Sequence, residues 1–378
     1  MTNIDLALYP LLNPGFLGDK IEDVEEELFL LYTRRASFRS EGNNDGGVDP
    51  PLRSILVSDT GNGSALGLVD QRNDHIELQF TFPNHRSSTA DARRQPKASR
   101  KTGKLGNDSK RRGEGEDRKR TDVQLETIDI TLAQDITGLR SRVGDTESGG
   151  GVWRGSVLLA QALLTHFHQT APDRLFDPVL LKNSHVLELG AGTGLLGLIL
   201  GPLVAQWTCT DLPEMIPLIR KNLALNQEST FRQKGASSNS GKLNATPLDW
   251  NTVHECTPAA RRRLFPLSDF GPTGSDLAGV GDKEERIDDG IDLIVAVDCV
   301  YNPSLIPPLL TTIDHFSSSN KTITLVVMEL RDDEVVRQLL TQWSAMSTWE
   351  IWRVGNDVHP ALLDERFVIW AGMKGSSC

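Results

Sequence analysis

The segment best suited to chemistry is a glycine-rich loop near the middle of the chain. Residues 186–200 read VLELGAGTGLLGLIL, an apolar run that leads into closely spaced glycines and a second apolar run. Glycine has no Cβ, so such a loop lets the backbone approach a ligand, and a strand, loop and helix in this order are typical of nucleoside-binding sites. The next apolar run ends at Asp211, whose carboxylate can accept hydrogen bonds from ribose hydroxyls. The sequence therefore predicts a nucleoside-containing cofactor.

Two cofactors are compatible with this loop. Gly192, Gly194 and Gly197 satisfy the G-x-G-x-x-G fingerprint of dinucleotide-binding proteins, which leaves an NAD(P)-dependent oxidoreductase as an alternative. Glu188 and Gly190, just before them, complete a pattern that resembles the first motif of class I methyltransferases, which bind S-adenosylmethionine. The chain has no Tyr-x-x-x-Lys pair of the kind that the oxidoreductase alternative requires. The sequence therefore favours S-adenosylmethionine.

The elements around the loop predict an α/β fold. Apolar runs at 185–189, 207–210, 244–248, 291–297 and 322–328 alternate with helical patterns, as in a doubly wound, mostly parallel sheet, and two last strands at 349–354 and 366–371 suit an antiparallel hairpin. Ligands of such sheets bind beyond the carboxyl ends of the strands. Each acid at those ends could by itself be a helix N-cap, but together they indicate a site. The residues at these ends are Gly190–Gly194, Asp211, Asp249–Trp250, Asp298 and Glu329–Arg331.

A second motif follows the run at 291–297. Asp298-Cys299-Val300-Tyr301 resembles the Asp-x-x-Tyr motif of the seven-β-strand protein lysine methyltransferases, also called methyltransferase family 16. Within that family the chain is most similar to fungal ribosomal lysine methyltransferases, and the resemblance includes Gly151–Trp153. It implies a seven-stranded, Rossmann-like class I fold, S-adenosylmethionine as cofactor, and methylation of a protein lysine, with a protein of the large ribosomal subunit as substrate.

The resemblance also implies roles for individual residues. Asp298 and Tyr301 would face the substrate lysine, and we expect Asp298 to orient the ammonium group while Tyr301 shapes the channel. Cys299 has no neighbouring histidine, so packing is its expected role. By chemistry alone, either tryptophan of the pocket could be a core residue instead. The residues that would line the cofactor pocket are Trp153, Glu188, Gly190, Ala191, Gly192, Asp211, Trp250 and Val297.

Composition narrows the class of protein. The chain has 378 residues, a net charge of −11, and four cysteines without C-x-x-C spacing, so neither a metal site nor a disulfide framework is predicted. The opening residues lack the basic and cleavage features of a secretory signal. We therefore expect a cytoplasmic or nuclear protein with no membrane segment.

Three regions differ in composition. Residues 1–90 suggest an elaboration that is partly β, with a helix at 21–32 and strands at 54–58, 65–69 and 75–82. Residues 91–122 predict a disordered insertion, because positions 93–120 hold twelve basic and four acidic side chains and almost no apolar ones.

The basic insertion could be a solvated loop or a tether for RNA or the ribosome. Residues 123–378 predict the methyltransferase domain, with a further insertion at about 265–290. A non-catalytic, cofactor-binding module associated with the ribosome would share this fold. Only a turnover assay separates that module from an enzyme.

Overall fold

The computed structural model describes residues 4–40, 50–57, 68–70, 72–84, 124–135, 150–169, 174–227, 242–270, 290–356 and 362–376. The basic insertion predicted at 91–122 lies outside these ranges, as do most of the strand predicted at 65–69 and most of the insertion predicted at 265–290. Within the described ranges, no helix is both long and apolar enough to cross a membrane.

The centre of the molecule is an eight-stranded sheet with the order β1-β9-β10-β8-β7-β4-β5-β6. Strands β4 to β8 pair in parallel, whereas β10 pairs antiparallel with both β8 and β9. This arrangement confirms the doubly wound, mostly parallel sheet and the last hairpin. The strands are β4 (His185–Leu189), β5 (Gln206–Asp211), β6 (Lys242–Pro247), β7 (Leu293–Val297), β8 (Ile323–Glu329), β9 (Trp349–Val354) and β10 (Phe367–Lys374).

The eighth strand was not predicted. Strand β1 (Leu17–Lys20) extends the seven-stranded sheet at one edge by pairing antiparallel with β9, with Leu17 opposite Val354 and Lys20 opposite Trp352. Its sequence, LGDK, is short and has no alternation of apolar and polar residues, so it carries no strand signal. Pairing with the edge of a complete sheet, rather than local propensity, makes this segment a strand.

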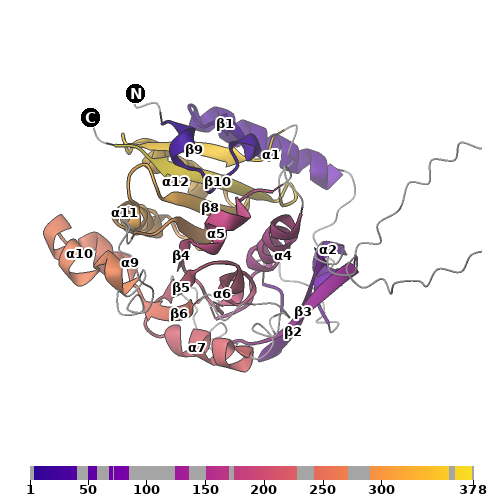
Figure 1. Cartoon of the computed structure of the whole chain (residues 1–378). Coiled ribbons are helices and arrows are strands. Elements are labelled where there is room, and N and C mark those ends of the chain that lie inside the picture. The colour runs from indigo at the N-terminus through magenta and orange to yellow at the C-terminus, as the bar shows by residue number, and fades with distance from the viewer. Residues whose placement is uncertain are drawn as a thin grey trace, which may run out of the picture.

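Helices cover both faces of the sheet (Figure 1). Side chains alternate between the faces along each strand, so Val186 belongs to one apolar cluster and Leu187 to the other. The first face is covered by α4 (Arg154–His168), α6 (Leu195–Leu200) and α7 (Ile216–Leu225). The second is covered by α1 (Val24–Ser40), α9 (Trp250–Glu255), α11 (Ile306–Phe316) and α12 (Asp333–Ser344). Two further short helices are α5 (Pro178–Lys182) and α10 (Pro258–Leu264).

One prediction for the N-terminal region was wrong. The strand predicted at 54–58 begins instead as the end of helix α2 (Pro50–Ile55), where Leu52 and Ile55 are buried at the i, i+3 spacing of a helix. Beyond the helix, Leu56 forms an isolated β-bridge with Leu78, and the Val57 N–H donates to the Glu77 carbonyl at 3.2 Å. The helix predicted at 21–32 is present as α1, and its Phe29 is 70% exposed. Leu28 and Leu31 occupy the buried face of α1, and Phe29 lies on the other side.

A separate two-stranded sheet joins the two sides of the basic insertion. Strands β2 (His75–Asn84) and β3 (Gln124–Ala133) pair antiparallel, and the alternate residues of β2 from Ile76 to Phe82 are buried. The side-chain amide of Asn226 on α7 bonds to both backbone groups of Thr131 on the outer edge of β3. These two strands are therefore fixed to the eight-stranded sheet through α7.

Asn222 makes the tightest of these links, and it reaches the glycine loop. Its Oδ1 accepts from the Ala133 N–H at 2.7 Å, and its Nδ2 donates to the carbonyls of Ala133 and Thr193, each at 3.0 Å. Asn222 is fully buried. One side chain thus connects the N-terminal hairpin with the loop that follows β4.

Replacing Asn222 with alanine should lower the free energy of unfolding by about 2–3 kcal/mol, because it leaves buried backbone groups without partners. Urea denaturation would measure the change. The matched control is Asn183→Ala, since that amide bonds to the Val179 carbonyl at an exposed site and its loss should change stability by less than about 0.5 kcal/mol. Equal losses in the two variants would contradict the proposed link.

Candidate active site

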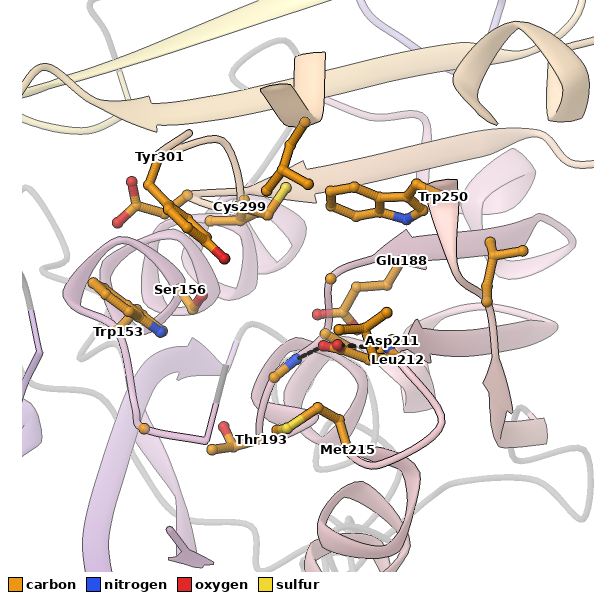
Figure 2. A pocket seen from close by; sticks show the side chains of 18 of the residues that line it. Trp153, Ser156, Glu188, Thr193, Asp211, Leu212, Met215, Trp250, Cys299 and Tyr301 are labelled. Carbon is orange, nitrogen blue, oxygen red and sulfur yellow. Dashed lines mark hydrogen bonds between the residues drawn. The ribbon is translucent and has the colours of Figure 1, made fainter. Parts of the chain in front are cut away.

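The site lies where the order of the strands reverses. Strand β4 is flanked by β5 on one side and β7 on the other, so the connections leave β4 in opposite directions and a crevice forms at the carboxyl ends. A cavity of about 610 Å³ opens at this place (Figure 2). All the site residues expected from the sequence line it, namely Trp153, Glu188, Gly190, Ala191, Gly192, Asp211, Trp250, Val297, Asp298 and Tyr301.

The floor of the cavity is the glycine loop. Gly190, Gly192 and Gly194 have φ angles of 70°, 56° and 78°, in the left-handed region that favours glycine. A Cβ at Gly190 would lie 2.9 Å from the Cβ of Cys299 and 3.4 Å from the Trp250 ring. The loop therefore needs glycine both for its backbone angles and for its closeness to the opposite wall.

Asp211 closes one side of the loop. Its Oδ2 accepts from the Gly192 N–H at 2.7 Å, and its Oδ1 accepts from the Leu212 N–H at 2.8 Å. Burial raises the pKa of Asp211, while these two amide hydrogen bonds act in the opposite direction. A carboxylate has about four acceptor positions, so Asp211 can hold the loop and still accept hydrogen bonds from a ligand in the cavity.

Glu188 lies below the loop. Its Oε2 accepts from the Trp207 indole N–H at 2.7 Å and from the Cys209 thiol at 3.4 Å, both on the neighbouring strand β5. Burial raises the pKa of Glu188 to about 7. One oxygen of the Glu188 carboxyl group thus ties β4 to β5 directly below the glycine loop. Glu188 therefore supports the position of the loop.

The raised pKa of Glu188 predicts a pH-dependent stability. Between its ordinary pKa of 4.5 and about 7, the unfolded chain releases the Glu188 proton while the folded chain retains it, so stability is lost as the pH rises. Through Glu188, wild type should lose about 3 kcal/mol of unfolding free energy between pH 4.5 and pH 8. Glutamine does not titrate, so Glu188→Gln should not show this loss. Urea denaturation at both pH values would measure this. The control Glu77→Gln, on the exposed face of β2, should behave as wild type, and a parallel pH response of all three proteins would exclude the effect.

Trp250 forms the wall opposite the glycine loop. It begins helix α9, whose N-cap is Asp249: the Asp249 carboxylate accepts from the Asn251 N–H at 2.9 Å and from the Thr252 hydroxyl at 2.8 Å. Asp249 therefore acts as a helix N-cap, which is the alternative role that the sequence left open for each acid at a strand end. The indole N–H of Trp250 is buried and has no hydrogen-bond partner among the described residues. The residue lines the cavity, where its indole ring offers an apolar aromatic surface.

Trp153 lies at the other end of the cavity, beside Tyr301 (Figure 2). The N-terminal region holds it in place, because Leu68 forms a β-bridge with Trp153 and the Val69 N–H donates to the Val152 carbonyl at 2.8 Å. The Val152 N–H in turn donates to the Gln134 side chain at 2.8 Å, just beyond β3. The N-terminal elaboration thus builds part of the cavity wall.

Asp298 follows β7 with an unusual backbone. Its φ is 54°, which is uncommon for a residue other than glycine and occurs most often at functional sites. Its N–H donates to the Val327 carbonyl at 2.8 Å, and its Oδ1 accepts from the Glu329 N–H at 3.2 Å. Its Oδ2 forms an ion pair with Arg331. Burial raises the pKa of Asp298, and the positive charge of Arg331 opposes that rise.

The ion pair belongs to a larger network that the sequence did not predict. Arg331 also pairs with Glu329 at 2.9 Å, and Glu329 pairs with Arg154 at the start of α4. The Arg331 guanidinium lies over the Trp153 ring, 5.2 Å from its centre. Glu329 and Arg331 could be expected near the site because they follow a predicted strand. Nothing in the sequence singled out Arg154.

Cys299 packs against the glycine loop. Burial raises the pKa of its thiol well above the ordinary range, which disfavours the thiolate that a nucleophile needs. Together with the close approach of its Cβ to Gly190, this agrees with the packing role expected for Cys299.

A family model described as lysine methyltransferase matches residues 121–263 and 281–340, which together are more than half of the chain. The chain belongs to this family. That membership confirms the resemblance of the Asp-x-x-Tyr motif and makes S-adenosylmethionine the cofactor, in place of the NAD(P) alternative. Gly197, which completed the dinucleotide fingerprint, packs closely on β5, where an added Cβ would lie 2.6 Å from the Cys209 sulfur.

Several curated relatives of this lysine methyltransferase family are similar to the chain. The protein-lysine N-methyltransferase EFM2 of Saccharomyces cerevisiae is 26% identical over 209 residues, covering 51% of this chain and 41% of EFM2. The protein N-lysine methyltransferase METTL21A of Danio rerio is 28% identical over 167 residues, covering 43% and 59% of the two chains. Ribosomal lysine N-methyltransferase 5 of Zygosaccharomyces rouxii is 28% identical over 245 residues, covering 57% and 70%. The chain thus spans less than two thirds of the first two relatives.

Two features of the cavity fit S-adenosylmethionine. Gly190, Ala191 and Gly192 line the cavity with a backbone that turns through positive φ angles, so backbone rather than bulky side chains can lie against a ligand there. The Asp211 carboxylate also lines the cavity and keeps acceptor positions beyond its two amide contacts, as the ribose hydroxyls of the cofactor require. The residues present are therefore compatible with this cofactor.

Proposed function

We propose that the chain is an S-adenosylmethionine-dependent protein lysine N-methyltransferase. The observation that carries this proposal is one cavity that Asp211, the glycine loop, Asp298 and Tyr301 all line. Figure 2 shows Asp211 on one side of it and Trp153 and Tyr301 on another. Asp298 belongs with Trp153, because its partner Arg331 lies over the Trp153 ring. A transfer enzyme needs its two substrates in line and close together, and a continuous cavity at the switch point of the sheet provides that arrangement.

The cofactor would be held mainly by residues on the Asp211 side of the cavity. Asp211 would accept hydrogen bonds from the ribose hydroxyls, since its carboxylate keeps acceptor positions beyond the two amide contacts. The backbone of Gly190–Gly192 would lie against the amino-acid portion, and the Trp250 indole would contact the adenosine. Ala191, Trp153 and Val297 would complete the wall, with Glu188 supporting the loop from below.

The chemistry is a displacement at carbon. When bound, S-adenosylmethionine supplies an electrophilic methyl group, so the lysine nitrogen lone pair forms the new N–C bond while the electron pair of the C–S bond leaves with sulfur. A lysine ammonium has no lone pair, and with an ordinary pKa of about 10.4 only about one lysine in 2,500 is neutral at pH 7. This corresponds to a penalty of about 4.6 kcal/mol, which the protein must reduce by desolvating the side chain.

Asp298 is the group suited to receive the lysine. Its side chain is almost fully buried, and a carboxylate in that position can accept an N–H of the incoming amine and orient the nitrogen. Tyr301 also lines the cavity, at the end where Trp153 lies (Figure 2), and would shape the channel for the aliphatic part of the lysine. The amine proton would be released to water as the side chain enters.

We further propose a large-subunit ribosomal protein as the substrate and the cytoplasm as the place of action. The name of the Zygosaccharomyces rouxii relative supports the ribosomal substrate. The basic insertion at 91–122 lies outside the described residues, so its contact with ribosomal RNA stays a prediction. We also propose that residues 1–90 act as a structural part of the catalytic unit, since Leu68 and Val69 support Trp153.

A labelling experiment tests the proposed function. The protein would be incubated with S-adenosylmethionine carrying a labelled methyl group and with purified large ribosomal subunits, whose proteins are then separated. A labelled ribosomal protein is the expected result. Absence of label with ribosomes, but its presence with a whole-cell extract, would reject only the ribosomal substrate. Absence in both would favour the non-catalytic, cofactor-binding module.

A further inference from the structure

We infer that Arg331 is a positioning residue that neutralises Asp298, so that the site can orient a substrate lysine without stabilising its protonated form. The inference rests on the proposed lysine methylation. It concerns a residue outside the Asp-x-x-Tyr motif, carried to the site by the neighbouring strand β8.

The charges around Asp298 are balanced in pairs. Asp298 and Glu329 lie at the ends of the adjacent strands β7 and β8, and Arg331 contacts both carboxylates. Arg154 contacts Glu329 from helix α4. Two carboxylates thus face two guanidinium groups. The side chains of both acids are only 6% exposed, so these charges are poorly screened by water and act strongly on any group placed beside them.

Other charged groups around the cavity do not replace Arg331. Arg366 directly precedes the neighbouring strand β10, and its guanidinium pairs with Asp364 instead. The Arg337 side chain pairs with Glu25 and Glu334 on the surface of α12. The charged residues that line the cavity are all acidic, namely Asp298 together with Glu188, Asp211, Glu214 and Asp249.

A carboxylate without a counter-charge would hinder the reaction. A negative charge within about 4–6 Å of an amine favours the ammonium form, and the ammonium cannot attack a methyl group. With Arg331 in place, Asp298 can still accept a hydrogen bond from the amine, but the network as a whole carries no net negative charge. Arg331 thereby allows Asp298 to orient the amine of the lysine without favouring the protonated form of that amine.

The contacts of Arg331 suit this role better than a purely structural one. It uses Nη2 for both ion pairs, whereas its buried Nε has no hydrogen-bond partner among the described residues. Its side chain is 27% exposed and lies over the ring of Trp153, which lines the cavity. Glu329 keeps Arg154 as a partner when Arg331 is removed. The strand end should therefore remain folded in a variant that lacks the Arg331 charge.

Binding of a lysine side-chain analogue tests the inference without cofactor or turnover. The probe is n-butylammonium chloride, titrated by NMR or calorimetry at neutral pH. Arg331→Gln should bind it about tenfold more tightly than wild type, because Asp298 then lacks its counter-charge. Arg337→Gln removes the same charge from the surface of α12 and should bind as wild type. Unchanged or weaker binding by folded Arg331→Gln would overturn the inference.

A second variant, with the opposite expected effect on binding, keeps the test decisive even if Arg331→Gln does not fold. Glu329→Gln removes one negative charge from the same network, so Arg331 compensates Asp298 more fully and n-butylammonium should bind more weakly than to wild type. Circular dichroism melting would verify that each variant is folded. Tighter binding by folded Glu329→Gln would overturn the inference independently.

The pH profile of methyl transfer provides the second readout, with purified large ribosomal subunits as acceptor. In Arg331→Gln, the rise of kcat/KM with pH should move up by about one pH unit, while Arg331→Lys, which retains the charge, should stay near wild type. A profile of Arg331→Gln that coincides with wild type would reject the role of Arg331 alone. No transfer by wild type at any pH, to these subunits or to a whole-cell extract, would instead reject the proposed function.

Discussion

Replacing Asp298 with asparagine should lower the rate of methyl transfer by about 100- to 1,000-fold, as expected when a charged orienting group is lost from an active site. Asparagine is nearly isosteric and can still accept from the Glu329 N–H, so the fold should be kept. The affinity for S-adenosylmethionine should stay within about threefold of wild type, because the polar contacts assigned to the cofactor come from Asp211 and the glycine loop and not from Asp298. Initial rates and calorimetric titration measure the two quantities separately.

Asp332→Asn is the matched control for this variant. Asp332 is close in sequence to the ion-pair network but caps helix α12, accepting from the Glu334 N–H at 2.9 Å, and asparagine is an equally good cap. Its transfer rate should equal that of wild type. An Asp298→Asn enzyme that keeps its rate, or one that loses cofactor affinity instead, would contradict the role given to Asp298.

Replacing Asp211 with alanine should weaken S-adenosylmethionine binding by about 100-fold, which corresponds to about 2.7 kcal/mol and to the loss of charge-assisted hydrogen bonds. The variant removes the acceptor for the ribose and also releases the Gly192 and Leu212 N–H groups that now bind the carboxylate. Calorimetric titration with S-adenosylmethionine would measure the change.

Asp211→Asn separates these two contributions. Asparagine can accept from one of the two backbone N–H groups, so the loop should be partly held while the charge is lost, and a loss of about tenfold in affinity is expected. Wild-type affinity in the alanine variant would show that the cofactor does not depend on Asp211.

The main sheet could be predicted from the sequence because its strands carry their own signal. Apolar runs such as 185–189 and 349–354 have the length of strands, and the structure places β4 and β9 at those positions. Strand β1 could not be found in this way, since the four residues Leu17–Lys20 become a strand only by pairing with β9. The segment at 54–58 failed for a related reason: a short apolar run such as Ile55–Val57 suits the end of a helix as well as a strand, and packing decides where the helix ends.

The position of the site could also be predicted, because parallel strands bring their carboxyl ends to one edge. The partners of its side chains could not. Asp298 and Arg331 are 33 positions apart, and their ion pair depends on β7 and β8 being neighbours with the register that places Val297 beside Val327. The contact of Asn222 with both β3 and the glycine loop likewise depends on how α7 packs. Such links appear only when the strands and helices are placed in space.

The chemical identity of the methylated residue tests the central claim most directly. After incubation with labelled S-adenosylmethionine and large ribosomal subunits, or with a whole-cell extract, the labelled protein would be hydrolysed and its amino acids separated. The label should co-migrate with N-methylated lysine, and Asp298→Asn should strongly reduce this signal. Label on arginine, histidine or a carboxyl group, or label on lysine that does not depend on Asp298, would contradict the central claim.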